Sequence, residues 1–154
     1  MSVTQAMRFL SGQKIPHEIK EYDHRQKGAE FAADALGWPL DAMVKTLVAH
    51  LDGPGFVLVL MPGNLELSLK KLAREAGVKG ARMASVEEAE RQTGYLVGGI
   101  SPFGVKRPMK VYMHDTIPKL PRIGINGGRR GAMAFLDPAC ALKSLDATVA
   151  DLSA

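Results

Sequence analysis

The clearest structural signal in the sequence is the stretch Val44-Lys45-Thr46-Leu47-Val48-Ala49-His50-Leu51-Asp52-Gly53-Pro54-Gly55-Phe56-Val57-Leu58-Val59-Leu60-Met61. Two apolar runs, residues 44–51 and 56–61, are rich in β-branched side chains, and the connection between them contains an Asp-Gly turn signal. This pattern predicts a β-hairpin. Because both arms are apolar on both faces, we expect the hairpin to lie in the interior of the protein.

Lys45 is a lone cation within this apolar hairpin. On a strand it shares one face with Leu47, Ala49 and Leu51. An unpaired buried ammonium is costly, so the sequence predicts that a carboxylate, a set of carbonyls or an anionic ligand meets the charge. The alternative is a lysine at a strand end whose ammonium reaches water while its stem stays buried.

Short strands and helices are predicted on both sides of the hairpin, and no strand is followed by a crossover helix at Rossmann spacing. We therefore predict an α/β fold with a mixed, strongly curved, barrel-like sheet that carries helices on its outside. The predicted helices cover residues 5–12, 29–36, 68–76, 85–92 and 137–143, with a helical turn at residue 41, and the further strands cover residues 17–22, 95–97, 110–113, 123–126, 132–135 and 148–150.

Length and composition fit a single globular domain over residues 1–154, with 46% apolar and 23% charged residues. The formal net charge of +4 permits a polyanionic partner without requiring one. The N-terminus lacks a secretory signal pattern, and the apolar runs are shorter than the ~20 residues of a membrane span. We expect a soluble, cytoplasmic protein.

Two glycine-marked loops are candidates for a binding site: Gly98-Gly99-Ile100-Ser101-Pro102 and Gly127-Gly128-Arg129-Arg130-Gly131. Consecutive N–H groups in such turns can converge on a carbonyl oxygen or an anion, although each loop can also be a simple turn. In the second loop, the two arginines either contact phosphate or point into solvent. Ser101 is a candidate nucleophile, but its surroundings do not match a G-x-S-x-G elbow.

No metal or cofactor is predicted. The four histidines (residues 17, 24, 50 and 114) form no metal-binding pattern, and Cys140, the only cysteine, is more typical of a core residue. Phosphate-loop and dinucleotide fingerprints are absent. The basic side chains are a solvated surface or a phosphate-contacting rim: Lys70, Lys71, Arg74, Lys79, Arg82, Lys106, Arg107, Lys110, Lys119, Arg122, Arg129 and Arg130.

Taken in order, several of these segments resemble the YbaK/EbsC family, whose members are free-standing relatives of the editing domain in bacterial prolyl-tRNA synthetases. The most specific segment is Thr93-Gly94-Tyr95-Leu96-Val97-Gly98-Gly99-Ile100-Ser101-Pro102. Tyr22, the Lys45-Thr46-Leu47 segment and the Gly127–Gly131 loop complete the resemblance, which covers nearly the whole chain. It implies a mixed barrel-like sheet flanked by helices, in agreement with the pattern above.

The resemblance implies aminoacyl-tRNA deacylation in trans, without a cofactor. The best-known members remove cysteine from mischarged tRNA(Pro), and other members act on alanyl, seryl or threonyl esters. The implied partners are the 3′-terminal aminoacyl-adenosine and acceptor stem of tRNA, and a prolyl-tRNA synthetase. No membrane or DNA partner is implied.

Site roles follow from the resemblance by position. Lys45 matches the essential lysine of the family and would bind the terminal adenosine or its phosphate. Backbone N–H groups of Gly99, Ile100 and Ser101 would stabilise the oxyanion formed from the ester carbonyl. The implied substrate-binding residues are Tyr22, Thr46, Gly98, Pro102, Asn126, Gly127, Gly128, Arg129 and Arg130.

Two positions depart from the family pattern. Asn126 stands where many members carry serine, and Met133 stands where many carry a small polar or acidic residue. For a cysteinyl ester the family mechanism is attack by the substrate's own thiolate, which would make the enzyme a lyase; for other esters a water would attack, as in a hydrolase. The alternatives are a non-catalytic module that binds aminoacyl-tRNA or a synthetase, and a small hydrolase that uses Ser101.

Overall fold

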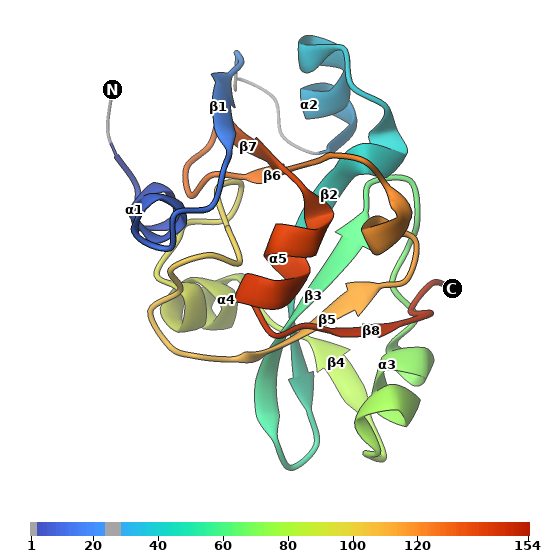
Figure 1. The fold of residues 1–154 in the computed structure, drawn as a ribbon. Helices are drawn as coiled ribbons and strands as arrows, with labels where there is room; N and C mark the ends of the chain where they lie inside the picture. Colours follow the sequence, from blue (N-terminus) through green and yellow to red (C-terminus); the bar gives the residue numbers. More distant parts are fainter. Residues whose placement is uncertain (1–2, 24–28) are drawn as a thin grey trace.

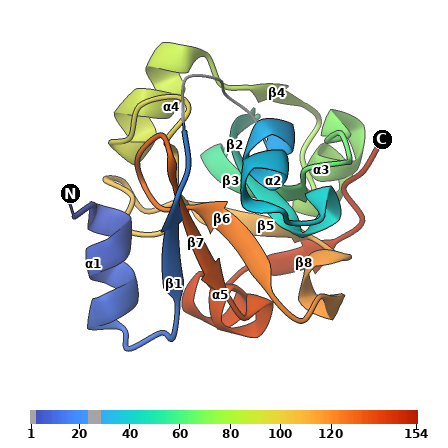
Figure 2. The same cartoon turned by 90° about the horizontal axis from the view of Figure 1, so that it is seen from above.

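The computed structural model describes residues 3–23 and 29–154. Eight strands form one mixed, curved sheet in the order β1-β7-β6-β2-β3-β5-β8, with β4 paired to β2, and helices surround it (Figures 1 and 2). The predicted α/β fold with a mixed, curved sheet is confirmed.

The strands are β1 (Glu18–Glu21), β2 (Met43–Leu51), β3 (Gly55–Pro62), β4 (Ala81–Met83), β5 (Lys110–His114), β6 (Ile123–Asn126), β7 (Ala132–Leu136) and β8 (Thr148–Ala150). The helices are α1 (Gln5–Gly12), α2 (Ala29–Leu36), α3 (Leu69–Ala76), α4 (Val86–Thr93) and α5 (Pro138–Ser144). Two 3-10 turns, η1 (Leu40–Ala42) and η2 (Ile117–Lys119), complete the described elements.

Helix boundaries follow the capping residues. The side chains of Thr4, Ser68 and Ser85 accept hydrogen bonds from the first-turn N–H groups of α1, α3 and α4. Each bond satisfies a donor that the helix itself cannot pair, so the start of each helix is determined locally. Gly77 ends α3 in the left-handed conformation at φ +71°, which costs glycine little.

Strand β2 lies at the centre of the sheet between two apolar cores. Val44 and Val48 face a cluster that contains Leu58 and Leu60, whereas Ala49 and Leu51 face a second cluster on the other side of the sheet. The predicted hairpin is confirmed, because β2 pairs with β3 along almost its whole length. The burial of both faces explains why both arms read as continuous apolar runs.

On the edge of β2 opposite β3, the pairing with neighbouring strands is interrupted. This interruption positions the pocket described below. At its start β2 pairs with β6 through Met43 and Val44, and at its end it pairs with β4 through residues 49–51. On this edge, the described ladders leave residues 45–48 without a paired strand, apart from the bond from Ala84 N to Val48 O (3.0 Å). The sheet is therefore open beside the middle of β2.

Two parts of the sequence-based assignment differ from the structure. The strand predicted over residues 95–97 is wrong, since this segment forms turns. Its backbone is paired locally: Tyr95 N donates to Thr93 Oγ1 (3.1 Å) and Val97 N donates to Glu90 Oε2 (2.8 Å). Strand β4 was not predicted, because its three residues carry no period that would distinguish them from a loop.

Candidate active site

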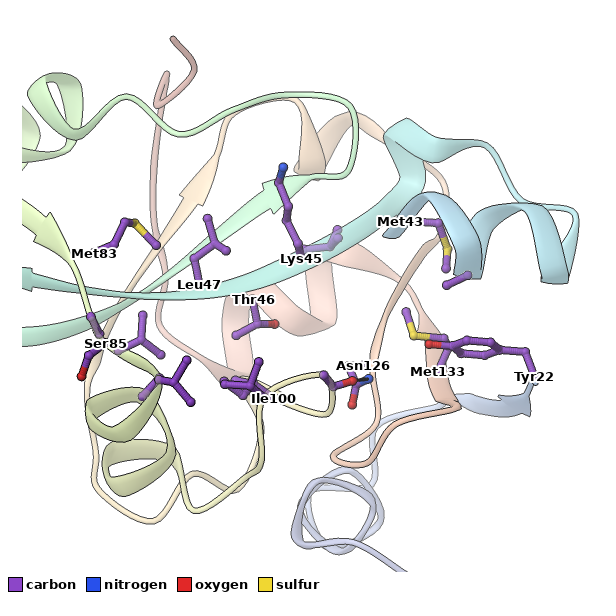
Figure 3. A pocket seen from close by; sticks show the side chains of 18 residues that line it. Tyr22, Met43, Lys45, Thr46, Leu47, Met83, Ser85, Ile100, Asn126 and Met133 are labelled. Atoms are coloured by element: carbon purple, nitrogen blue, oxygen red, sulfur yellow. Dashed lines mark hydrogen bonds between the residues drawn. The ribbon is translucent and has the colours of Figure 1, made fainter. Parts of the chain in front are cut away.

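A pocket of about 300 Å³ lies at the open edge of β2 (Figure 3). Its walls come from β2, from the connection between β4 and α4, from the first glycine loop and from the start of the 126–131 turn. Such a pocket is of the size that takes a small organic group. The lining residues are Tyr22, Ala32, Met43, Val44, Lys45, Thr46, Leu47, Val48, Met83, Ala84, Ser85, Val86, Ala89, Val97, Gly98, Ile100, Asn126 and Met133.

Lys45 lies at the rim of the pocket rather than in its interior. Its Nζ is 3.8 Å from Glu66 Oε1, and its side chain is 25% exposed, whereas that of Glu66 is 89% exposed. Of the partners that the sequence allowed, the structure shows a carboxylate, and the ammonium also reaches solvent. Because exposed pairs of this kind contribute only about 0–1 kcal/mol, an incoming anion can displace Glu66 at little cost.

Thr46 points to the opposite side of β2 from Lys45, towards Ile100 (Figure 3). Its Oγ1 is buried and has no hydrogen-bond partner among the described residues. A buried hydroxyl that lacks a partner costs roughly 1–3 kcal/mol. A polar group of a ligand in the pocket would remove that penalty, so this hydroxyl is a candidate contact for a substrate.

The two glycine loops pack against each other through their backbones. A Cβ added to Gly99 would lie 2.7 Å from Arg129 Cα, so no larger residue fits there without a shift of the backbone. Asn126 joins the loops: its Nδ2 donates to Gly98 O (3.3 Å), and its Oδ1 accepts from Gly128 N (2.7 Å). Asn126 therefore fixes the orientation of the loop that faces the pocket.

Within the first loop, Gly98 and Ile100 line the pocket, and the other residues are placed differently. The N–H of Gly99 donates to Leu96 O at 2.8 Å, which corrects the expectation that it is available to an oxyanion. The Ser101 side chain is fully buried and its Oγ accepts from Phe103 N at 3.2 Å, which argues against an exposed serine nucleophile. Pro102, the last residue of the loop, is also buried.

Tyr22 and Met133 lie together at one end of the pocket (Figure 3). Burial raises the pKa of the Tyr22 hydroxyl, and a backbone hydrogen bond with Gly131 and the charge of Arg130 oppose this rise. The phenol is therefore neutral at physiological pH. Met133, like its neighbour Met43, is buried and offers a polarizable apolar wall.

Gly127, Gly128 and the arginines lie beside the pocket rather than in it. Gly127 N donates to Ala132 O within the hairpin turn. Arg129 Nη2 is 2.9 Å from Glu21 Oε1, and Arg130 packs over Gly98. Together with Gly128 they line a second cavity of about 480 Å³ that shares Val97 with the first. Arginines at this place can contact the phosphates of a larger ligand whose end occupies the pocket.

Sequence reasoning missed the wall formed by residues 83–86 and the partner carboxylate of Glu66. The capping box Ser85–Glu88 was visible in the sequence, and it correctly located the helix. Its position against β2, however, depends on the pairing of β4 with residues 49–51, for which the sequence carries no local signal.

No group of three or more potential metal-ligating side chains occurs in residues 3–23 and 29–154. Among the same residues, no helix is long and apolar enough to cross a membrane. His24, one of the four histidines considered above, lies outside the described residues.

The chain is similar to proteins that are named for tRNA editing. Residues 24–143 match the family described as "Aminoacyl-tRNA editing domain". The chain is 34% identical over 154 residues to EbsC of Enterococcus faecalis, which is named provisionally as a Cys-tRNA(Pro)/Cys-tRNA(Cys) deacylase; the match covers 97% of this chain and 93% of EbsC. A crystal structure described provisionally as a trans-editing enzyme for prolyl tRNA synthetase matches with a TM-score of 0.89 and 28% identity, covering 100% of this chain and 99% of that one.

Proline–tRNA ligases share part of this similarity. The ligase of Sulfurihydrogenibium sp. is 33% identical over 130 residues, which cover 82% of this chain but 22% of the ligase. The similarity is thus confined to a small part of the ligase.

Proposed function

Because the chain belongs to the aminoacyl-tRNA editing domain family, we propose that it is a trans-acting deacylase that removes a wrongly attached amino acid from tRNA, most specifically cysteine from Cys-tRNA(Pro). One observation carries this proposal. The pocket joins a cation at its rim, a buried unpaired hydroxyl and a glycine loop, yet its described lining contains no carboxylate, histidine or cysteine. Such a site can hold a reactive group of the substrate in position, but it offers none of these three side-chain types to attack that group.

An aminoacyl ester suits such a site because it is already activated. Catalysis then needs orientation of the ester and stabilisation of negative charge on the carbonyl oxygen. We assign the second role to the N–H of Ile100, since the N–H of Gly99 is bonded to Leu96 O and Ile100 lines the pocket. The ammonium of Lys45, on the other side of β2, holds the terminal nucleotide of the tRNA.

For a cysteinyl ester, the substrate supplies its own nucleophile. The thiolate attacks the ester carbonyl, a C–S bond forms, and the C–O bond to the ribose breaks. The ribose oxygen leaves with the electron pair and takes up a proton, so the products are a cyclic thioester and deacylated tRNA. The apolar wall of Met43 and Met133 excludes water from this step and matches the softness of sulfur.

Substitution of Lys45 tests the proposed site. Lys45→Ala should reduce kcat/KM for the charged tRNA by at least roughly tenfold, the loss expected when one charge-assisted contact of about 1.5–3 kcal/mol is removed. Lys143→Ala, which removes an exposed lysine of α5, is the matched control and should leave the rate unchanged. Equal rates for the two variants would remove Lys45 from the site.

Blocking the substrate thiol separates the two chemical routes. A cysteinyl ester whose sulfur is methylated cannot cyclise, so its cleavage should stop while its binding persists. Continued cleavage of the methylated ester would show that a water attacks instead. Binding of charged tRNA without cleavage of any ester would favour the non-catalytic module.

A further inference from the structure

The pocket extends around the open edge of β2, so that it has two chemically different sides. Thr46, Ile100 and Asn126 lie on one side of the strand, and Lys45, Leu47 and Met83 lie on the other (Figure 3). The register agrees with this view. Met83 is opposite Ala49, and residues paired across two strands share a face, so Met83 is on the face that carries Leu47 and Lys45.

The side with Lys45 has an apolar surface next to a cation. Met83 is 43% exposed, although methionine is usually buried, and Leu47 is its diagonal neighbour on the sheet. Lys45 precedes Leu47 by two residues on the same face, roughly 7 Å away along the strand. This spacing is suited to a planar base on the apolar side chains and a phosphate on the ammonium.

The main chain at Met83 is tied to its neighbours on both sides. Arg82 Nη1 and Nη2 bind the two oxygens of Glu88 at 2.8 and 3.0 Å, and Arg82 Nη1 also contacts Met83 O at 3.3 Å. The bond from Arg82 and those from Ser85 lower the pKa of Glu88 to about 2, so its carboxylate stays ionised in this pair. Ala84 N is bonded to Val48 O, which ties the segment to β2. Because the main chain at Met83 is already positioned, a ligand would have to order only the methionine side chain.

We propose that Leu47 and Met83 form a platform for the purine base of the tRNA's 3′-terminal nucleotide, with its 5′-phosphate on Lys45. This assignment rests on the proposed function and gives the substrate a direction through the pocket. The nucleotide occupies the open side, and the aminoacyl group passes the unpaired edge of β2 to reach Thr46 and Ile100. A thioether against an aromatic ring contributes about 0.3–1.5 kcal/mol, which corresponds to roughly twofold to tenfold in affinity.

Binding of free nucleotides tests this platform without catalysis. Titration of the intact protein with AMP, CMP and adenosine, followed by NMR chemical shifts, should give the tightest binding for AMP. Met83→Ser should weaken AMP binding by roughly twofold to tenfold, to the level of CMP. Lys45→Gln should weaken it to the level of adenosine. Val149→Ser, which truncates a similarly exposed apolar residue on β8 outside both cavities, is the control and should bind AMP as the unchanged protein does.

Three outcomes would overturn the platform: equal binding of AMP and CMP, no binding of AMP at millimolar concentrations, or equal AMP affinity of the Met83→Ser and Val149→Ser variants. Steady-state deacylation separates this failure from failure of the proposed function. If the protein cleaves an aminoacyl ester but Met83→Ser leaves KM unchanged, the platform alone is wrong. If AMP binds as expected but no ester is cleaved, the nucleotide site is supported and the deacylase activity is contradicted.

Discussion

Lys45 and Thr46 are consecutive in β2, and the alternation of side chains along a strand sends them to different sides of the pocket. One residue is a cation with a weak exposed partner, and the other is a buried hydroxyl without a partner. A ligand that pairs with the ammonium of Lys45 or with the hydroxyl of Thr46 would therefore be stabilised by that contact. A substrate that passes the open edge of β2 can contact both.

Thr46→Val should separate function from stability. The change replaces a buried hydroxyl that has no partner with a methyl group, so the free energy of unfolding should stay equal or rise by about 1 kcal/mol. Deacylation should nevertheless fall by roughly tenfold, the equivalent of one lost hydrogen bond of about 1.4 kcal/mol. Urea denaturation and single-turnover deacylation measure the two effects, with Thr46→Ser as the control that keeps the hydroxyl. Full activity in the valine variant would show that this hydroxyl does not contact the substrate.

Glu66→Gln should strengthen substrate binding. The carboxylate competes with the substrate's phosphate for Lys45, and an exposed pair is worth up to about 1 kcal/mol, so KM should fall by up to roughly fivefold. Glu75→Gln removes the same charge from the exposed surface of α3 and is the matched control. A weaker substrate affinity in Glu66→Gln than in Glu75→Gln would mean that Glu66 supports Lys45 rather than competing for it.

At the scale of elements, the site depends on the close contact between two loops. Gly99→Ala should destabilise the fold by roughly 1–3 kcal/mol, because its Cβ would meet backbone atoms of Arg129 that cannot rotate away. Gly12→Ala is the control: it lies in α1 with nothing within 4 Å of an added Cβ, and it should be neutral or stabilise by up to about 1 kcal/mol. Urea denaturation of both variants provides the comparison. Equal stabilities would contradict the loop packing.

Most elements could be predicted from the sequence because their signals are local. The central hairpin, the capped starts of α1 and α4, and the short hairpin around Gly127–Gly128 all follow from patterns within a few residues. Residues 95–97 misled the prediction, since an apolar triplet resembles a strand whether or not another strand pairs with it.

The site could be predicted only in part. Its glycine loops and Lys45 stand out in the sequence, and the shared face of Lys45 and Leu47 follows from strand geometry. The open edge of β2 could not be predicted, because it results from the registers of two distant partners, β4 and β6. The bond that occupies the N–H of Gly99 is a detail of loop conformation that no residue pattern specifies.

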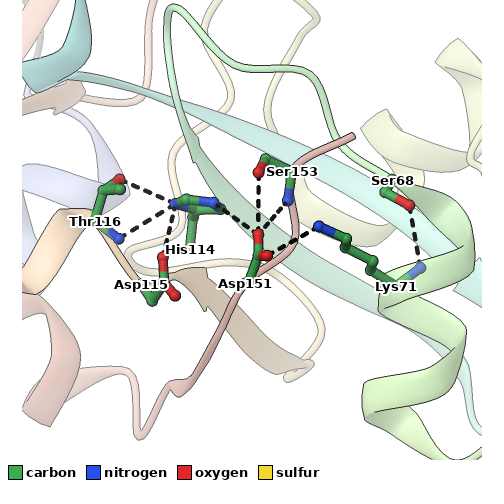
Figure 4. A network of polar contacts seen from close by, with 7 residues as sticks. All are labelled: Ser68, Lys71, His114, Asp115, Thr116, Asp151 and Ser153. Carbon is green, nitrogen blue, oxygen red and sulfur yellow. Dashed lines mark hydrogen bonds and ion pairs between the residues drawn. The ribbon is translucent and has the colours of Figure 1, made fainter.

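At the scale of the whole molecule, residues 151–154 connect the sheet to the loop that carries Glu66. Ser68 N donates to Leu152 O (2.7 Å), and Ala154 N donates to Glu66 O (2.9 Å). Asp151 anchors this segment through Lys71 Nζ at 2.9 Å, and buried His114 Nε2 lies 3.4 Å from Asp151 Oδ1 without hydrogen-bond geometry (Figure 4). The main chain at Glu66, whose carboxylate faces Lys45, is thus held by residues 151–154, which are distant in the sequence.

The contribution of Asp151 to the free energy of unfolding should depend on pH. The hydrogen bond from Lys71, followed by those from Ser153, holds the pKa of Asp151 below its ordinary value. A lowered carboxyl pKa stabilises the fold fully above about pH 4, and this contribution disappears as the pH falls towards the folded-state value. Asp151→Asn should therefore be less stable than the unchanged protein at about pH 7, and the difference should shrink at about pH 2.

Urea denaturation across this pH range checks the anchor, with Asp41→Asn as a control that removes an exposed carboxylate elsewhere. A stability difference for Asp151→Asn that is the same at both pH values would contradict the role of the ionised Asp151.

Deacylation of a panel of charged tRNAs measures the proposed editing activity itself. The panel consists of cysteinyl, alanyl, seryl and threonyl esters on tRNA(Pro), with the cognate prolyl ester as the control. Under the proposed function, the unchanged protein should release cysteine from Cys-tRNA(Pro) and leave prolyl-tRNA intact. Release of no amino acid from any of these esters would contradict it.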